Sequence, residues 1–356
     1  MNGLRNGHAR VGVVGCGVIA AAYAEGAVAF DSFSVDACAD SDAERAQALA
    51  SAHGLEVMSV DGLIASPEID VVLNLTPPDA HAAVVGGALD AGKHVYTEKP
   101  LTTSIPAARE LVASAARLGL RIGCAPDTFL GSAYEAAREL IARGDIGEPL
   151  GATAAMLVGG ADTWHPNADF FFRAGAGPML DLGPYYLTAI ASLLGPFASA
   201  TGFAETPTPE RTLAVGPRAG ERFRVDVPTY VAAALRLESG ALATLTVSFE
   251  SRGQYDSRMT VHGTEGALSL PDANHFEGEL RVFNGGGDWH VVPYVSRGPQ
   301  ETRGYGLHEM LEAERDGRPH RASGELGLHV LETATAVLRS AEEGRTIDVV
   351  SRFSQP

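Results

Sequence analysis

Cysteine is scarce in this sequence of 356 residues, which contains only Cys16, Cys38 and Cys124. Three cysteines cannot all pair, and neither a C-x-x-C motif nor a Cys/His spacing typical of zinc is present. The sequence therefore predicts no metal site and a reducing compartment, which favours a cytoplasmic location. It also lacks any uninterrupted apolar run of the roughly 18 residues that a membrane helix needs, so we expect no membrane-spanning segment.

Basic side chains are few as well. The chain has 27 Lys and Arg residues against 44 Asp and Glu residues, a formal net charge of −17. A body this acidic repels a phosphate backbone, which argues against nucleic acids and anionic membranes as partners. A hydrophobic fraction of 45% is enough to build a core and excludes a disordered chain. The composition predicts a folded protein that binds small molecules.

The length suggests two domains, and the pattern of the first 125 residues differs from that of the rest. In residues 1–125 strand-like and helix-like stretches alternate. The expected strands are Arg10–Val14, Ser34–Ala39, Ile69–Leu75, His94–Thr97 and Arg121–Cys124. The expected helices are Ile19–Phe30, Asp42–His53, Asp79–Ala91 and Ser104–Leu118. Such alternation predicts an α/β domain of the Rossmann type, with a doubly wound parallel sheet. Sheets of this type commonly bind dinucleotides such as NAD(P), and the motifs below bear on that possibility.

Residues 126–356 are expected to form an α+β domain for substrate binding and oligomerisation, built on a large, mostly antiparallel sheet with one open face. Its expected strands are Gly151–Val158, Tyr230–Glu238, Ala241–Glu250, Met259–His262, Ala267–Leu270 and Leu280–Phe283. Its expected helices are Ser132–Arg143, Gly177–Leu194, Gly306–Arg315 and Gly324–Glu343, and the last two are candidates to pack back on the first domain. Thr206–Glu221, rich in Pro, Gly and charge, is predicted to be a surface loop.

The apolar segment Val11–Ala22 follows two arginines and has two interpretations: a signal peptide, or a strand that leads into a cofactor loop. The alternation that follows favours the cofactor loop. Gly15-x-Gly17-x-x-Ala20 stands after a strand and opens a helix. Gly15 permits a tight turn, Gly17 lets the backbone approach a pyrophosphate, and Ala20 is small enough for the helix to pack on the strand.

Asp40 directly follows the second expected strand, 20 residues after Ala20. A carboxylate at this place accepts hydrogen bonds from both ribose hydroxyls and repels a 2′-phosphate. The residue after it is Ser41, and the nearest arginine is Arg45, so NAD is expected rather than NADP. The predicted cofactor contacts from this part of the chain are Gly15, Gly17, Val18, Ile19, Asp40, Ser41 and Arg45.

With three further motifs the sequence resembles the glucose-fructose oxidoreductase / inositol dehydrogenase (Gfo/Idh/MocA) family. These motifs are the run N-L-T-P-P-D-A-H at 74–81, Glu98-Lys99-Pro100, and the run G-P-M-L-D-L-G at 177–183. Their order and spacing span residues 10 to about 190. The resemblance implies that Thr76, Pro77 and His81 lie near the nicotinamide half of NAD. It further implies a role for Glu98 in cofactor binding.

The resemblance also implies that Lys99 lies beside the nicotinamide and the reacting carbon, with a cis peptide bond before Pro100. The sequence departs from the family at the residue that is expected to act as the catalytic acid and base. The family's helix usually contains D-x-G-x-H, whereas this sequence has Asp181-Leu182-Gly183-Pro184-Tyr185. Asp181 therefore matches the family and the histidine is replaced by Tyr185. Because the two are four residues apart, we expect them on one helix face, with Tyr186 turned to the core.

A hydroxyl that loses hydride must also lose its proton, and three residues are candidates to accept it. Tyr185 is one, provided that Lys99 lowers its pKa. Lys99 itself is the second. The third is His165, in the segment Trp164-His165-Pro166-Asn167 that precedes three phenylalanines. The predicted catalytic residues are thus Lys99, Asp181, Tyr185 and His165. The predicted substrate contacts are Lys99, Trp164, His165, Asp181 and Tyr185.

These features predict an NAD-dependent oxidoreductase that moves hydride between nicotinamide and a hydroxyl or ketone carbon of a sugar, glycoside or cyclitol. One alternative is a redox-neutral glycoside hydrolase or lyase, which oxidises a ring hydroxyl only transiently. The absence of the histidine of the D-x-G-x-H motif is the reason to consider this alternative. Another is a non-catalytic nucleotide-binding protein, which has no need of both Lys99 and Asp181. The resemblance also implies a homodimer or homotetramer formed through exposed sheet faces.

Overall fold

The computed structural model describes residues 7–252, 255–298 and 301–354. The chain forms two compact units. The first consists of residues 1–130, 297–328 and 354–356, and the second of residues 131–296 and 329–353. None of the helices in the described ranges combines the length and the apolar composition that crossing a membrane requires.

The first unit is built on a six-stranded parallel sheet in the order β3-β2-β1-β4-β5-β6. Its strands are β1 (Ala9–Val14), β2 (Phe33–Ala39), β3 (Glu56–Val57), β4 (Val71–Asn74), β5 (His94–Thr97) and β6 (Ile122–Cys124). Its helices are α1 (Val18–Ala27), α2 (Ala43–His53), α3 (Val60–Ala65), α4 (His81–Asp90), α5 (Ile105–Leu118) and α9 (Tyr305–Asp316). The strand order reverses between β1 and β4, where such sheets bind ligands at the carboxyl ends of their strands.

Local sequence explains these elements well. All four residues of β4 are buried, as expected for a strand covered on both faces. The side chain of Asp42 caps α2 by accepting hydrogen bonds from the N–H groups of Glu44 and Arg45. At the other end Gly54 closes the helix in the left-handed conformation. The short pair β3 and α3 was not predicted, because two residues of strand and six of helix leave little periodic signal.

The second unit contains a nine-stranded sheet in the order β16-β15-β14-β13-β7-β12-β11-β8-β17. The strands are β7 (Pro149–Leu157), β8 (Phe197–Glu205), β11 (Tyr230–Leu237), β12 (Leu242–Ser248), β13 (Asp256–Gly263), β14 (Ala267–Leu270), β15 (Arg281–Phe283), β16 (His290–Val291) and β17 (Ile347–Asp348). All neighbouring pairs are antiparallel except β7 and β12. The prediction of a mostly antiparallel sheet is confirmed.

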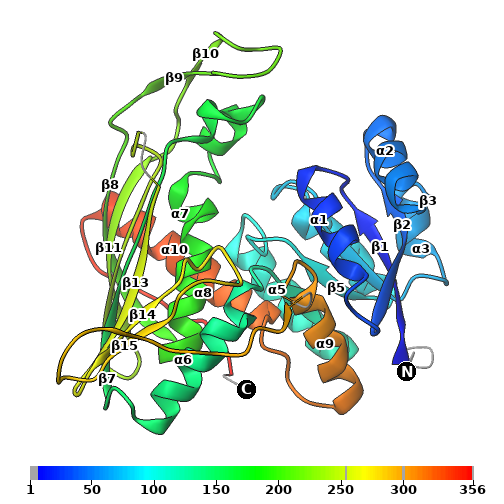
Figure 1. Cartoon of the computed structure of the whole chain (residues 1–356). Helices are drawn as coiled ribbons and strands as arrows, with labels where there is room; N and C mark the ends of the chain where they lie inside the picture. The colour runs from blue at the N-terminus through cyan, green and yellow to red at the C-terminus, as the bar shows by residue number, and fades with distance from the viewer. Residues whose placement is uncertain (1–6, 253–254, 299–300, 355–356) are drawn as a thin grey trace. The chain divides into compact units, whose positions relative to one another are not determined.

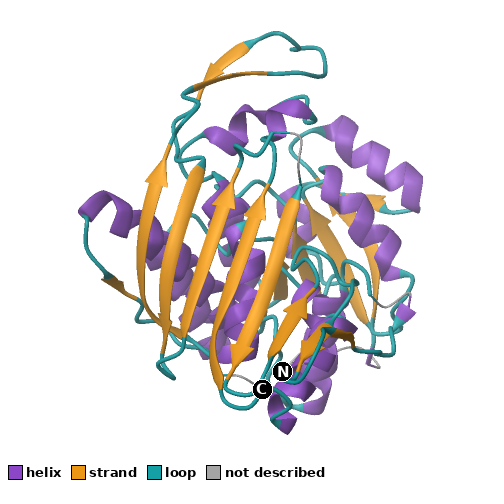
Figure 2. Ribbon diagram, turned by 60° about the vertical axis from the view of Figure 1, so that its left-hand side comes forward, coloured by secondary structure: helices purple, strands orange, loops and turns teal. Residues whose placement is uncertain are grey.

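Helices cover one face of this sheet, and Figure 2 shows the other face without helices of the described residues. The covering helices are α6 (Ser132–Arg143), α7 (Pro178–Asp181), α8 (Gly183–Leu194) and the second-unit part of α10 (Gly324–Glu343), as Figure 1 shows. Side chains of β11 alternate between buried and more exposed, with Val231, Ala233, Leu235 and Leu237 inward.

Two predictions for the second unit were wrong in detail. The predicted loop Thr206–Glu221 contains β9 (Glu210–Thr212), which pairs with β10 (Arg222–Arg224) in a separate two-stranded sheet. Strand β8 was missed altogether. Its sequence contains three alanines and a glycine, which have low strand propensity, and its pairing with β11 overrides that preference.

Candidate functional site

The loop between β1 and α1 carries the glycine motif, and Gly15 adopts a conformation that suits only glycine, with φ of 99°. Its N–H donates to the carbonyl of Ala39 over 2.8 Å. A Cβ atom at this position would lie 2.6 Å from the carbonyl carbon and oxygen of Leu75 and 2.7 Å from the nitrogen of Thr76. Gly15 is therefore required both for the turn and for the close packing of two loops that follow β1 and β4.

Gly17 precedes the first turn of α1, and a Cβ atom added there would meet nothing within 4 Å. No side chain caps this end of the helix, and no acidic residue lies in its first turn. The first N–H groups of α1 are thus not engaged by a side-chain cap, which is the arrangement that binds phosphate oxygens. The open space at Gly17 suits the approach of a pyrophosphate.

Asp40 follows β2 and is held in place by backbone N–H groups. Its Oδ2 accepts a hydrogen bond from the N–H of Cys16 over 2.7 Å, and its Oδ1 accepts one from the N–H of Asp42 over 2.8 Å. Ser41 is exposed. Arg45 forms an ion pair with Asp42, with 3.1 Å between Nε and Oδ2. The carboxylate of Asp40 thus lies next to the glycine loop, and the nearest arginine is already paired with another carboxylate.

Cys16 lies in the same loop, but its surroundings do not activate the thiol as a nucleophile. Burial, together with Cys38 and Asp40, raises the pKa of its thiol to about 12. The thiol is therefore protonated at neutral pH, and nucleophilic chemistry at Cys16 is not favoured.

The ends of β4 and β5 are joined by polar side chains. The amide of Asn74 donates to Oγ1 of Thr97 over 3.0 Å, and the hydroxyl of Thr76 donates to Oδ1 of Asn74 over 2.7 Å. Asn74 and Thr97 are fully buried, whereas Thr76 is half-buried and Pro77 is exposed. This network fixes the loop that carries Thr76 against the end of β5.

The turn after β5 contains Glu98, Lys99 and Pro100, and the Lys99–Pro100 peptide bond is cis, as predicted. Oε1 of Glu98 accepts a hydrogen bond from the hydroxyl of Tyr23 over 2.9 Å, and Oε2 accepts one from the N–H of Lys99 over 3.1 Å. Tyr23 comes from α1, and burial raises the pKa of its phenol, which keeps it a donor. Glu98 therefore links α1 to the backbone of Lys99, whose side chain is half-buried.

His81 begins α4 behind this turn and is fully buried. Its Nδ1 lies 2.7 Å from the carbonyl oxygen of Pro100, and its Nε2 lies 2.8 Å from that of Thr76. Both ring nitrogens are thus occupied by backbone groups of the two loops just described.

In the second unit, Asp181 ends α7 and Tyr185 lies in the first turn of α8, and both side chains are half-buried. The predicted single helix is interrupted at Leu182. Pro184 has no N–H to continue the hydrogen-bond ladder, and the N–H of Tyr185 instead donates to the carbonyl of Leu182. Asp181 and Tyr185 are therefore not four residues apart in one regular helix.

Tyr186 is buried, as predicted, and its hydroxyl donates to Oδ1 of Asp272 over 2.8 Å. The other carboxylate oxygen of Asp272 accepts a hydrogen bond from the hydroxyl of Tyr255. Burial and Asp272 raise the pKa of Tyr255, and the phenol of Tyr185 adds to that rise. Tyr255, whose hydroxyl is bonded to Asp272, thus belongs to the electrostatic surroundings of Tyr185.

His165 lies within a cluster of aromatic rings formed by Trp164, Phe170 and Phe171. The ring centroids of these residues lie 5.5, 5.4 and 5.6 Å from that of His165, and Trp164 is 62% exposed. Nδ1 of His165 accepts a hydrogen bond from the N–H of Asn167 over 3.1 Å. The cluster therefore presents a partly exposed aromatic surface with an imidazole in it.

Ion pairs hold this aromatic segment in place. Buried Arg211 pairs with Asp162 and with Glu250, each at 2.8 Å. Its guanidinium also lies 4.9 Å from the ring centre of Phe172, a cation–π contact. Because both flanks of the segment are anchored, the conformation of the residues between them is restricted.

Two family models match the chain. Residues 9–125 match the oxidoreductase family with the NAD-binding Rossmann fold, and residues 134–269 match the GFO/IDH/MocA C-terminal domain. The chain belongs to the Gfo/Idh/MocA family. It is accordingly an NAD-binding oxidoreductase, and the predicted fold class, with a Rossmann sheet and a mostly antiparallel second sheet, is confirmed.

Relatives match over nearly the whole length. A 1,5-anhydro-D-fructose reductase from Ensifer adhaerens is 28% identical, with 96% of this chain and 98% of the relative covered. An inositol 2-dehydrogenase from Rhizobium meliloti is 26% identical, with 96% and 99% covered. The crystal structure of an NAD binding oxidoreductase from Klebsiella pneumoniae is 26% identical and superposes with a TM-score of 0.83 over 97% of this chain and all of the other.

Within this Gfo/Idh/MocA chain, the residues predicted from the glycine loop, the Thr76 run and the Glu98-Lys99-Pro100 motif come together at the carboxyl ends of β1, β2, β4 and β5. Asp181, Tyr185, Trp164 and His165 all belong to the second unit. Sequence reasoning missed Tyr23, Tyr255 and Asp272. The signal for them is weak, because each makes its contact with a residue far away in the chain.

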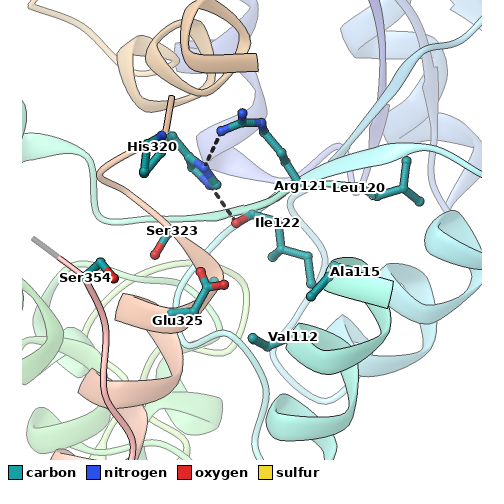
Figure 3. A pocket seen from close by; sticks show the side chains of 12 residues that line it. Val112, Ala115, Leu120, Arg121, Ile122, His320, Ser323, Glu325 and Ser354 are labelled. Carbon is teal, nitrogen blue, oxygen red and sulfur yellow. Dashed lines mark hydrogen bonds between the residues drawn. The ribbon is translucent and has the colours of Figure 1, made fainter. Parts of the chain in front are cut away.

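A cavity of about 290 Å³ lies in the first unit, and none of the predicted site residues lines it. It lies between α5 and the start of α10, and Arg121 and His320 provide part of its polar lining (Figure 3). Nη1 of Arg121 donates to Nδ1 of His320, and Nε2 of His320 donates to the carbonyl of Ile122. These polar groups are bonded to one another, so we do not assign the cavity to the candidate site.

Proposed function

We propose that the chain oxidises or reduces a polyhydroxylated substrate, a sugar, glycoside or cyclitol, with NAD as the hydride carrier. The observation that carries the proposal is the edge of the parallel sheet where the glycine loop, Asp40, Thr76 and Lys99 are gathered. The names of the relatives, a 1,5-anhydro-D-fructose reductase and an inositol 2-dehydrogenase, support a polyol or sugar ketone as the substrate class.

Each group of the nucleotide edge has a proposed task. The N–H groups at the start of α1 bind the pyrophosphate, and Gly17 leaves room for it. Asp40 accepts hydrogen bonds from the ribose hydroxyls, and its charge disfavours a 2′-phosphate, which selects NAD over NADP. Thr76 and Pro77 line the nicotinamide half. When bound, the nicotinamide supplies the hydride acceptor or donor.

Proton transfer is proposed to depend on Lys99, Asp181 and Tyr185. In the oxidation direction the substrate C–H bond gives hydride to the nicotinamide and the O–H bond gives its proton to a base. Tyr185 is our first choice for that base, with Lys99 favouring its phenolate by charge. Asp181 is proposed to hold a substrate hydroxyl. His165 is the alternative acceptor, and the aromatic rings around it are proposed to contact the substrate.

An absorbance assay for NADH tests the function. The purified protein is supplied with NAD or NADP and a panel of cyclitols, sugars and aryl glycosides, and the products are followed in parallel. We expect NADH to accumulate with at least one polyol and NAD to be preferred over NADP. Glycoside cleavage without accumulation of NADH would instead establish redox-neutral hydrolysis or elimination.

Replacing Tyr185 with phenylalanine is expected to lower kcat by about 100-fold or more, because it removes the phenolate oxygen that is proposed to accept the proton and keeps the ring. Tyr230→Phe is the matched control, since Tyr230 lies on the second unit's sheet at an exposed position. The measurement is kcat for both variants with the substrate found in the panel. A kcat unchanged in Tyr185→Phe but collapsed in His165→Gln would assign the proton to the imidazole.

We further propose that the protein is cytoplasmic and forms a homodimer or homotetramer. The three cysteines are buried and free, which suits a reducing compartment. The open face of the nine-stranded sheet exposes Phe203, Tyr230 and Leu242, which a second copy would cover. Light scattering of the purified protein measures the assembly size, and a monomer would contradict the oligomer.

A further inference from the structure

One buried side chain connects the two loops that carry Thr76 and Lys99. The imidazole of His81 has no exposed surface, and each of its nitrogens faces a backbone carbonyl oxygen, that of Pro100 at 2.7 Å and that of Thr76 at 2.8 Å. A carbonyl oxygen only accepts hydrogen bonds, so a nitrogen of His81 that carries a proton donates to the loop that it faces, and either nitrogen can do so.

The two carbonyls belong to segments that the sequence separates. Thr76 follows β4, and Pro100 follows Lys99 in the turn after β5. The bond between Asn74 and Thr97 joins the ends of the two strands themselves. His81 instead joins the loops beyond those ends, where the proposed nicotinamide contacts and the proposed catalytic lysine lie. A buried carbonyl without a donor destabilises the loop that carries it, so the position of each loop is coupled to this ring.

We propose that His81 is a positioning residue, which sets the Thr76 loop and the Lys99–Pro100 turn with a single imidazole and touches neither cofactor nor substrate. This inference rests on the proposed function for the roles of Thr76 and Lys99. It differs from the expectation that His81 contacts the cofactor, because a side chain with no exposed surface and both nitrogens occupied offers nothing to a ligand.

The two bonds can be separated by substitution. The side-chain nitrogen of asparagine is as many bonds from Cβ as Nδ1 of histidine, and that of glutamine is as many as Nε2. His81→Asn therefore retains a donor for the carbonyl of Pro100 and loses the one for Thr76. His81→Gln retains a donor for Thr76 and loses the one for Pro100. The two variants are each other's matched control.

Two measurements separate the effects of the two hydrogen bonds. Calorimetric titration gives the NAD dissociation constant, and mass spectrometry gives the rate at which Lys99 is acetylated. We expect His81→Asn to weaken NAD binding about tenfold and to leave the acetylation rate near that of the wild type. We expect His81→Gln to change the acetylation rate of Lys99 and to bind NAD as the wild type does. With a substrate in hand, His81→Gln should also lower kcat more than His81→Asn.

Equal effects of the two variants on both readouts, or no effect of either, would overturn the positioning role. If a variant does not fold, the wild type with nitrogen-15 in its histidine rings is used, and the His81 signals are identified by elimination with variants of the other ten histidines. Saturating NAD should then shift the His81 signals, and unchanged signals would overturn the inference. Failure of the wild type to bind NAD at all would instead refute the proposed function.

Discussion

Lys99→Met lowers kcat by about 10²- to 10⁴-fold while NAD binding changes by only a few-fold. The reason is that the substitution removes the ammonium group beside the proposed reacting carbon, but leaves the apolar stem and the backbone of the turn. The N–H of Lys99 still donates to Glu98, which Tyr23 holds from α1. Steady-state kinetics and NAD titration on the same preparation separate the loss of turnover from the loss of binding.

Lys93 is the matched control, because Lys93 and Lys99 are the two lysines of the sequence. Lys93 is buried, and its Nζ donates to the carbonyls of Ser66 and Ile69 over 2.7 and 2.6 Å. Lys93→Met should therefore reduce the free energy of unfolding and leave kcat of the folded protein unchanged. If Lys99→Met turned over at the wild-type rate, the proposed role of Lys99 would be wrong.

Gly15→Ala is expected to lower the free energy of unfolding by about 3 kcal/mol and to abolish measurable NAD binding. Two causes add. An alanine is strained at a φ of 99°, and its Cβ would lie 2.6 Å from the carbonyl group of Leu75. Relief of that clash must move the Thr76 loop or the glycine loop, and both are proposed to contact the cofactor. Chemical denaturation and NAD titration provide the two measurements.

Gly54→Ala measures the backbone strain of a positive φ without the steric clash. Gly54 also has a positive φ, 71°, but a Cβ there would meet nothing within 4 Å. We expect a loss of about 1 kcal/mol in the free energy of unfolding and unchanged NAD binding. Equal losses in the two variants would show that the close packing of Gly15 on the Thr76 loop contributes nothing.

Much of the first unit could be predicted from the sequence, because each of its longer elements carries its own signal. The apolar strands around Val71–Asn74 and His94–Thr97 are bounded by turns, and α2 begins with a capping aspartate and ends with a glycine. The second unit was harder. Strand β8 depends on its pairing with β11 rather than on its own residues, and Pro184 breaks a helix that the apolar pattern suggested was continuous.

The candidate site was predictable where residues close in sequence form a motif, as in Gly15–Gly17 and Glu98–Pro100. It was not predictable where the contact joins distant segments. Tyr23 reaches Glu98 across 75 residues, and Tyr186 reaches Asp272 across 86. The position of His81 shows a further limit. Nothing in the motif indicates that the ring of His81 lies between the carbonyl oxygens of Pro100 and Thr76, as the structure shows.

The acetylation rate of Lys99 with and without NAD tests the central claim most directly, because it needs no substrate and the other lysine of the sequence, Lys93, is buried. The protein is treated with N-acetoxysuccinimide and the modified peptides are measured by mass spectrometry. NAD at saturation should slow acetylation of Lys99 several-fold. AMP, which lacks the nicotinamide half, should leave the rate unchanged, and Lys93 should react slowly throughout. An unchanged rate at Lys99 in the presence of bound NAD would contradict the claim that this lysine lies beside the nicotinamide.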